Sequence, residues 1–175
     1  DVTNELLTLD DMECLDRAGR PTYLLNVNGY PFDELPVSVQ KYLLEGEARG
    51  LPNKTLIKTR SPWYRMETRK IPPILFAYLG RRNTRFIRNL ANVVPLTCLL
   101  CVYPRHSDAR FVKSLWNVLS HPDTMANLAK VGKSYGGGAI KVEPRALERL
   151  PLPVPLVHAE GLDNMRVLEQ TQLEF

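Results

Sequence analysis

Residues 54–88 read K-T-L-I-K-T-R-S-P-W-Y-R-M-E-T-R-K-I-P-P-I-L-F-A-Y-L-G-R-R-N-T-R-F-I-R, and this stretch decides the fold that we expect. It holds ten lysines and arginines and a single acid, Glu67. Aromatic residues are interleaved with the charges, and the apolar runs between them are too short for helices. We therefore predict several short strands that present cations on one side, and a polyanion is the natural partner of such a surface.

Positive charge is concentrated in the middle of the chain. The 175 residues carry a net charge of +4, but residues 41–149 alone hold 20 basic and 7 acidic side chains. Residues 1–40 hold 2 basic and 8 acidic side chains, and residues 150–175 hold 1 and 4. The middle therefore carries +13 between two acidic ends, which favours a nucleic-acid or other phosphate partner.

Length and composition indicate a globular protein. With 44% hydrophobic residues the chain can form one domain with its own core. No apolar run approaches the roughly 18 residues that a transmembrane helix needs, and no signal peptide opens the sequence. We therefore expect a cytoplasmic protein without a membrane partner. Because the first residue is Asp1 rather than Met, we also expect a piece of a larger protein.

The cysteines favour neither a disulfide framework nor a metal site. There are three of them, and an odd number fits a reducing compartment. Cys98 and Cys101 have the spacing of half a zinc site, but residues 93–103 read as a buried strand, on which residues three apart point to opposite faces. We expect these thiols to pack as small buried hydrophobic groups and predict no metal.

Helices and strands are expected on both sides of the basic stretch. On its N-terminal side we expect a loose acidic lead-in over residues 1–20, a strand over 22–27 and an amphipathic helix over 35–46. Further strands are predicted near 55–58, 63–66, 74–79, 84–88, 96–103 and 139–142. Helices are predicted over 108–119, 123–131, 144–150 and 159–173, with an extended proline-rich segment at 150–155.

The connections between the central strands are short, so these strands should pair mostly antiparallel. The expected fold class is α+β: a mostly antiparallel twisted sheet with flanking helices, in a single compact domain. Within it we assign residues 1–34 to the lead-in and first strand, and residues 35–155 to a domain that would bind a nucleic acid. Residues 156–175 should form a C-terminal helix that packs on this domain or on the rest of the parent protein.

Motifs of catalysis and of cofactor binding are absent from the sequence. It contains no G-x-S-x-G, H-E-x-x-H, G-x-x-x-x-G-K-[ST] or G-x-G-x-x-G. The glycine cluster at 136–138 follows a predicted helix and precedes a strand, which is the reverse of a dinucleotide-binding turn. We expect no catalytic residue and no cofactor in this chain. A small hydrolase would need a site whose groups only folding brings together.

An ordered set of short boxes resembles a known module. The boxes are RSPWYR at 60–65, IPPI at 71–74, RFIRN at 85–89, VYP at 102–104, LWNVLS at 115–120, YGGG at 135–138 and EPRALERLPLP at 143–153. In this order they are similar to the C-terminal target-recognition region of adenine-N6 DNA methyltransferases from bacterial restriction-modification and phage-defence systems. The resemblance covers residues 35–155.

The resemblance implies a division of labour within a larger protein. Membership would join this chain to an N-terminal methyltransferase domain that binds S-adenosylmethionine. The catalytic Asn-Pro-Pro-Tyr/Phe signature of that family is missing here, because Pro72-Pro73 follows Ile71. The chain would then be the specificity part, inactive alone, and would hold double-stranded DNA while the other domain methylates a flipped adenine.

Candidate DNA-binding residues lie in the basic middle of the chain. Arginines and lysines would hold phosphates, whereas an arginine could read guanine, and Asn83, Asn89 or Asn92 could read adenine. Residues 61–64 and 71–74 are expected to be scaffold. The predicted DNA-binding set is Lys58, Arg60, Arg65, Arg69, Lys70, Arg81, Arg82, Asn83, Arg85, Arg88, Lys133, Tyr135 and Lys141.

Other interpretations of the basic stretch stay open from the residues alone. Its cations could dock an acidic neighbouring domain, which would make the chain a protein-interaction module without a direct nucleic-acid role. RNA could take the place of DNA as the polyanion. The stretch could also be a solvated sheet face whose arginines pack over aromatic rings.

Overall fold

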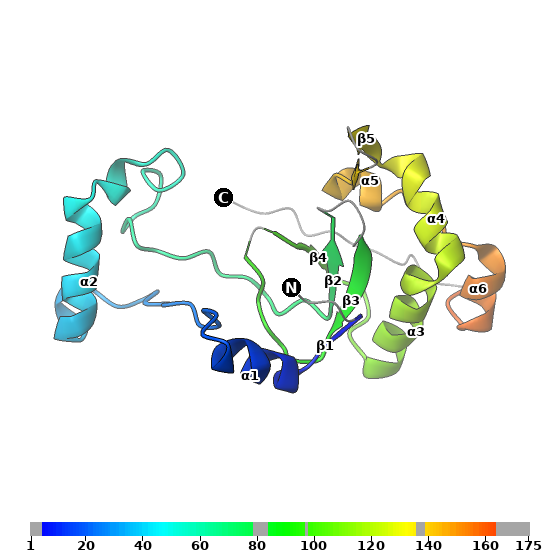
Figure 1. Cartoon of the computed structure of the whole chain (residues 1–175), viewed down its shortest axis with the longest axis horizontal. Helices are drawn as coiled ribbons and strands as arrows, with labels where there is room; N and C mark the ends of the chain where they lie inside the picture. Colours follow the sequence, from blue (N-terminus) through cyan, green and yellow to red (C-terminus); the bar gives the residue numbers. More distant parts are fainter. Residues whose placement is uncertain (1–4, 79–83, 97, 136–138, 164–175) are drawn as a thin grey trace. The chain divides into compact units, whose positions relative to one another are not determined.

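The computed structural model describes residues 5–78, 84–96, 98–135 and 139–163 (Figure 1). The chain folds as two compact units. The first, Asp1–Arg20 with Lys70–Glu174, is named the sheet unit, and the second, Pro21–Arg69, is named the insert unit. The domain boundary expected after residue 34 lies inside the insert unit.

A four-stranded mixed sheet forms the centre of the sheet unit. In spatial order its strands are β1 (Leu6–Leu7), β3 (Arg85–Asn89), β2 (Ile74–Ala77) and β4 (Leu100–Val102). β1 runs parallel to β3, whereas β2 is antiparallel to both β3 and β4. The mostly antiparallel sheet and its flanking helices confirm the predicted α+β class.

Strand alternation gives this sheet two buried faces. Ile74, Phe76 and Phe86 lie on one face, and the two phenylalanine rings are 4.6 Å apart between centroids. Leu75 and Ile87 lie on the other face. All five side chains are at most 1% exposed. The central strands are therefore buried on both sides, which explains the continuous apolar sequence of β2 and the adjacent Phe86 and Ile87 of β3.

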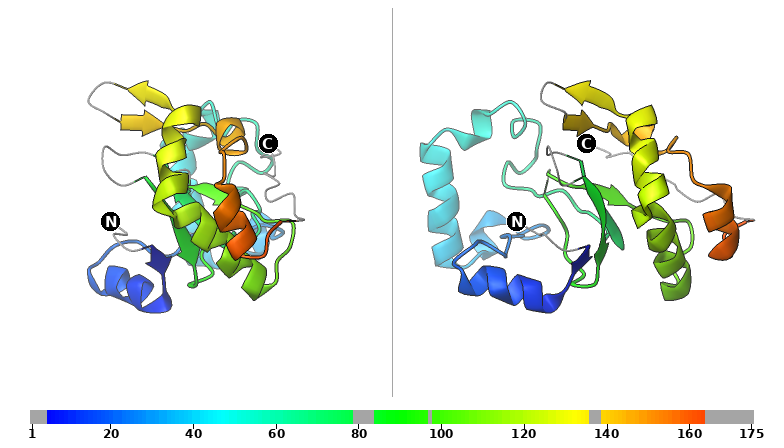
Figure 2. Two further views of the ribbon diagram at one scale, coloured as in Figure 1. Left: turned by 90° about the vertical axis from the view of Figure 1, so that its right-hand side faces the viewer. Right: turned by 45° about the vertical axis from the view of Figure 1, so that its right-hand side comes forward.

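Two helices cover the first face (Figure 2). They are α3 (Ala109–Ser120) and α4 (Pro122–Val131). The carboxylate of Asp108 caps α3 by accepting a hydrogen bond of 2.8 Å from the backbone of the third helical residue. Trp116 packs at the edge of this core, and its Nε1 donates to the carbonyl of Phe86. The buried side chains of α3 are Phe111, Val112, Leu115, Val118 and Leu119.

Residues 6–17 form a strand and a helix where a loose lead-in was expected. Leu7 of β1 is buried in the core of the second face, and Met12 of α1 (Leu9–Arg17) packs against that core. A capping box starts α1: the Thr8 hydroxyl accepts from the Asp11 amide at 3.3 Å, and the Asp11 carboxylate accepts from the Thr8 amide at 2.8 Å. The T-L-D-D sequence carries this signal, because a carboxylate at the third helical position returns the bond.

The C-terminal part begins with a hairpin of β5 (Lys133–Tyr135) and β6 (Ala139–Lys141), followed by α5 (Pro144–Leu147). The last described helix, α6 (Val154–Ala159), begins inside the segment that was predicted to be extended. Its proline lies in the first turn, where a missing amide hydrogen costs the helix nothing. Most of the helix predicted over 159–173 lies outside the described residues.

The insert unit contains α2 (Val37–Ala48) and two short 3-10 helices, Phe32–Glu34 and Leu51–Asn53. No strand forms between residues 21 and 69, all of which the structure describes, so the strands predicted at 22–27, 55–58 and 63–66 are wrong. Backbone amides and carbonyls there form hydrogen bonds within turns instead. The carbonyl of Lys54, for example, accepts from the amides of residues 57 and 58 at 2.8 and 2.9 Å. A segment with interleaved charged and apolar residues forms a strand only where a neighbouring strand is present to pair with it.

The core of the insert unit is small. Val27, Leu35 and Leu43 are buried, and the aromatic residues of the 61–64 box pack against them. Trp63 also donates from Nε1 to a carboxylate oxygen of Glu47 at 2.9 Å. The expectation that this box is scaffold therefore holds for its two aromatic residues.

Gly46→Ala should destabilise the insert unit. A Cβ at Gly46 would lie 2.7 Å from Cη2 of Trp63, and overpacking of this kind costs roughly 1–3 kcal/mol. Alanine at an unhindered helix position would instead stabilise by roughly 0.5–1 kcal/mol. Chemical denaturation measures the difference, with exposed Ser38→Ala on the same helix as the control. A more stable Gly46→Ala variant would contradict the packing.

Asn89→Ala should destabilise the sheet unit by roughly 2–3 kcal/mol, because it leaves buried polar groups without partners. The Asn89 side chain is 5% exposed and donates at 2.8 Å to the carbonyls of Pro72 and Val93. Its oxygen accepts from the Val93 amide at 3.1 Å. Denaturant unfolding tests this against Leu90→Ala, at an exposed neighbour. Equal stability of the two variants would show that these hydrogen bonds contribute little.

Candidate nucleic-acid interface

The predicted DNA-binding residues are divided between the two units. The insert unit carries Lys58, Arg60, Arg65 and Arg69. The sheet unit carries Lys70, Arg85, Arg88, Lys133, Tyr135 and Lys141. Arg81, Arg82 and Asn83 lie outside the described residues. Each unit is therefore considered by itself.

A group of exposed cations lies on residues 54–69, which we name the cationic loop. The side chains of Lys54, Lys58 and Arg65 are exposed, and none of the ion pairs within the described residues involves them. Charges without a neighbouring carboxylate create a positive potential that attracts a polyanion. The loop can thus offer several cations to successive phosphates.

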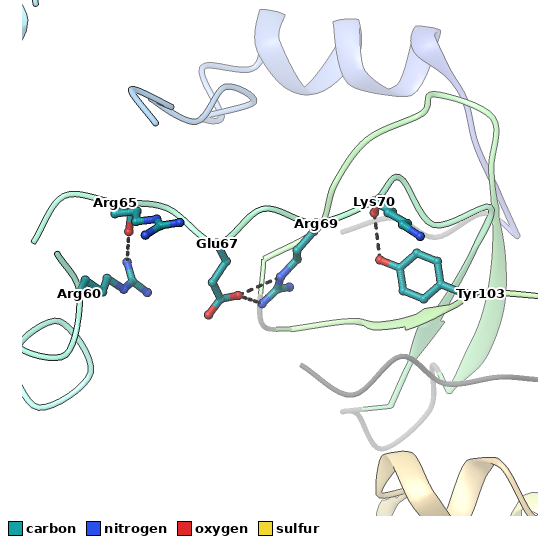
Figure 3. Close-up of polar contacts among 6 residues, drawn as sticks. All are labelled: Arg60, Arg65, Glu67, Arg69, Lys70 and Tyr103. Atoms are coloured by element: carbon teal, nitrogen blue, oxygen red, sulfur yellow. Dashed lines mark hydrogen bonds and ion pairs between the residues drawn. The ribbon is translucent and has the colours of Figure 1, made fainter. Parts of the chain in front are cut away.

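Arg60 makes a hydrogen bond within this loop (Figure 3). Its Nη1 donates to the carbonyl of Arg65 at 3.2 Å, which ties the two ends of the turn together. This bond uses one of several N–H donors of the guanidinium, so the group can still bind a phosphate. Arg60 therefore stiffens the loop and keeps its charge.

Arg69 differs from the other loop cations because its charge is compensated (Figure 3). Its Nη2 lies 2.5 Å from Oε2 of Glu67, and its Nε donates to the same oxygen at 3.0 Å. The arginine side chain is only 16% exposed. Glu67, the single acid of the basic stretch, is thus paired with Arg69. Arg69 therefore shapes the loop, and its charge is offset by Glu67.

Lys70 begins the C-terminal part of the sheet unit. Its carbonyl accepts a hydrogen bond of 2.9 Å from the Tyr103 hydroxyl, while its own side chain is exposed (Figure 3). Two residues later, Pro72 is fully buried and its carbonyl binds Asn89. The backbone that leads into β2 is thus fixed, in agreement with a scaffold role for residues 71–74.

Arg85 and Arg88 both lie on β3 but on opposite faces of the sheet, because residues three apart on a strand point in opposite directions. Arg85 is paired in register with Ala77, and Arg88 with Ile74. Both arginine side chains are half-buried. They therefore do not form one continuous cationic surface.

The hairpin brings two further cations together. Lys133 and Lys141 are directly opposite each other in its register, and Tyr135 ends its first strand. Nζ of Lys141 lies 2.9 Å from Oε1 of Glu143. This hydrogen bond and the charge of Lys141 lower the pKa of Glu143 below its usual value, and Lys133 adds a smaller effect. A carboxylate thus partly offsets the repulsion between the lysines.

The candidate base-reading asparagines have different environments. The side chain of Asn89 is buried and fully used in hydrogen bonds to the backbone, so the expectation that it could read adenine is wrong. Asn89 lies two residues after buried Ile87 on β3 and therefore on the same face of the sheet, so the sequence already indicated that it would be buried. Asn92 is exposed and has a positive φ of 54°. Asn83 lies outside the described residues.

One side chain that no sequence pattern indicates organises the cationic loop. Asn28 donates from Nδ2 to the carbonyl of Met66 at 2.7 Å, and its Oδ1 accepts from the Met66 amide at 2.8 Å. In the sequence Asn28 precedes Gly29 and simply indicates a turn. Only folding shows that the turn contacts a segment 38 residues later.

The two cysteines of the 98–101 pair have different environments. Cys98 is exposed and β4 begins only at Leu100, so the prediction of a buried thiol is wrong at that position. Cys101 is half-buried. Among the residues that the structure describes, no three His, Cys, Asp or Glu side chains are grouped to hold a metal ion. In the same residues, no helix is both long and apolar enough to span a membrane.

Two curated proteins are similar to this chain. It is 27% identical over 154 residues to the Type II methyltransferase M.AccI of Acinetobacter calcoaceticus, a match that covers 85% of this chain and 27% of that protein. It is 24% identical over 115 residues to the Type II methyltransferase M.XamI of Xanthomonas campestris pv. amaranthicola, covering 66% and 21%. The chain thus spans about a quarter of the length of these relatives. No solved structure matches it.

A family model identifies the chain more completely. The model for the C-terminal domain of the Type II methyltransferase M.Eco57I matches residues 2–173. This match confirms the resemblance to the C-terminal region of restriction-modification methyltransferases that the ordered boxes carry. The protein belongs to the family of the C-terminal domain of Type II methyltransferase M.Eco57I.

Proposed function

We propose that this chain is the DNA-recognition part of a larger adenine-N6 DNA methyltransferase. It holds double-stranded DNA while a separate N-terminal domain of the same protein binds S-adenosylmethionine and transfers the methyl group to a flipped adenine. The observation that carries this proposal is the cationic loop, where the exposed Lys54, Lys58 and Arg65 have no carboxylate partner among the described residues, in a chain of this family.

Such a division of labour has a physical reason. Taking a base out of the duplex costs a few kcal/mol, and the catalytic pocket contacts little more than that base. Contacts to the flanking phosphates supply binding free energy and fix the register of the duplex. A cationic surface on a second domain can therefore offset the cost of flipping.

The proposed residues have separate roles. Lys58, Arg60 and Arg65 bind phosphates, since they share one loop and none of the ion pairs among the described residues involves them. Arg81, Arg82 and Asn83 are proposed to reach base edges in the major groove. A second phosphate contact is proposed for the hairpin, where the candidate residues are Lys133, Tyr135 and Lys141.

A docking role for the insert unit is a second candidate, favoured by its many exposed large apolar side chains. Surfaces of this kind often contact another protein surface. A docking surface would require these apolar groups rather than the cations of the loop. The exposed residues are Tyr23, Leu24, Leu25, Tyr30, Val37, Tyr42, Leu44 and Leu56.

The double variant Lys58→Ala/Arg65→Ala should bind duplex DNA more weakly and with a shallower salt dependence. Each phosphate contact that is lost reduces the slope of log affinity against log salt by about one, so the slope should fall by about two. Fluorescence anisotropy on a random-sequence duplex measures this. Arg49→Ala is the matched control, because Arg49 is an exposed cation of the same unit paired with Glu45. Failure of the unmodified protein to bind any duplex at low salt would refute DNA recognition and leave the docking role.

In the intact protein the same double variant should raise KM for DNA by roughly tenfold and change kcat less than about twofold, because binding is lost without a change in the chemical step. Methyl transfer from tritiated S-adenosylmethionine measures both constants. Nucleoside analysis of the product identifies the acceptor base, for which we expect N6-methyladenine. Methylated cytosine would overturn the adenine assignment, and an equal loss of kcat would place the two cations in the chemical step.

A further inference from the structure

The cationic loop contains no strand, so other contacts must hold it in one conformation. Ordering a free backbone costs roughly 1–2 kcal/mol per residue, and cations on a disordered loop would incur this cost on binding DNA. The side-chain contacts that hold the loop include Trp63 to Glu47, Arg60 to the carbonyl of Arg65, Arg69 to Glu67, and Asn28 to Met66. Among them, the Asn28 tether binds both polar groups of one peptide backbone position.

The geometry of the Asn28 tether imitates strand pairing. A primary amide carries a donor and an acceptor side by side, as a peptide group does. Asn28 uses both, at 2.7 Å to the carbonyl and 2.8 Å to the amide of Met66. The side chain thus replaces the neighbouring strand that this segment lacks.

Asn28 is itself firmly placed. Val27, the residue before it, is buried in the core of the insert unit. Gly29, the residue after it, has a φ of 88°, a conformation that side chains other than glycine rarely adopt. The turn is closed by the Tyr30 amide, which donates to the carbonyl of Val27 at 3.3 Å. The amide of Asn28 therefore projects from a turn that the core anchors.

The tether acts directly beside candidate phosphate ligands. Met66 follows Arg65, whose amide donates to the carbonyl of Pro62 at 2.9 Å and whose own carbonyl accepts from Arg60. Fixing Met66 therefore completes the restraint of the backbone on both sides of Arg65. The Arg65 side chain stays exposed. The backbone is held while the charge is left free to bind.

We propose that Asn28 is a positioning residue for DNA binding: it pre-organises the 60–66 segment so that Arg60 and Arg65 meet the phosphates of a duplex without a further loss of loop entropy. This inference rests on the proposed function of the cationic loop. Asn28 is neutral and lies outside the basic stretch, yet DNA binding by that stretch depends on it.

Asn28→Ala in the intact protein tests the proposal. It removes no charge, yet it should weaken binding to a random-sequence duplex by roughly tenfold and reduce the salt slope by about one, as loss of the Arg65 contact would. Combined with Arg65→Ala, the two losses should be clearly less than additive. Asn53→Ala is the matched control, because Asn53 is an exposed asparagine of the same unit that is hydrogen-bonded through its backbone amide. Its binding should equal that of the unmodified protein.

A second measurement needs no variant. Hydrogen exchange of the unmodified protein should be slower at the Met66 amide than at the Thr68 amide, which has no partner among the described hydrogen bonds. Equal exchange at the two amides, or an unchanged salt slope in Asn28→Ala, would overturn the proposal. Absence of DNA binding by the unmodified protein would instead refute the proposed function. Slow hydrogen exchange at the Met66 amide would in that case still show that the Asn28 tether forms.

Discussion

The burial of β2 and β3 on both faces is the constraint on which the sheet unit depends. Alternate residues of these strands contact two separate cores, one covered by α3 and α4 and one that includes β1 and a side chain of α1. Because a shift of one residue would exchange the two faces, the register is strongly specified. Asn89 then fixes the end of β3 through three hydrogen bonds to the backbone.

The insert unit is held in its conformation in a different way. Only three of its large apolar side chains, Val27, Leu35 and Leu43, are buried, and its long cationic loop has no strand partner. Order there depends on particular contacts: the close packing of Trp63 on Gly46, and the paired hydrogen bonds between Asn28 and Met66. A loop held in this way keeps its side chains free, whereas a paired central strand would bury half of them.

Charge compensation separates the cations of the basic stretch into two kinds. Arg69 is largely buried beside Glu67, and Arg85 and Arg88 are half-buried on opposite faces of a strand. Lys58 and Arg65 are exposed and have no carboxylate partner among the described residues. Because the electrostatic attraction of a phosphate depends on net local charge, the second kind is better suited to bind DNA. A simple count of lysines and arginines does not make this distinction.

The sequence by itself determined the family, through the ordered boxes, and the elements with strong local signals. The apolar stripe and cap of α3, the proline and glycine at the ends of α4, and the short connections of an antiparallel sheet are all local patterns. Tertiary structure decided that the insert unit forms turns in place of the predicted strands, that Asn89 is buried and that Asn28 pairs with Met66. A polar side chain can bind water, a base or a distant peptide group equally well, and only the folded chain, which brings residue 28 to residue 66, selects among them.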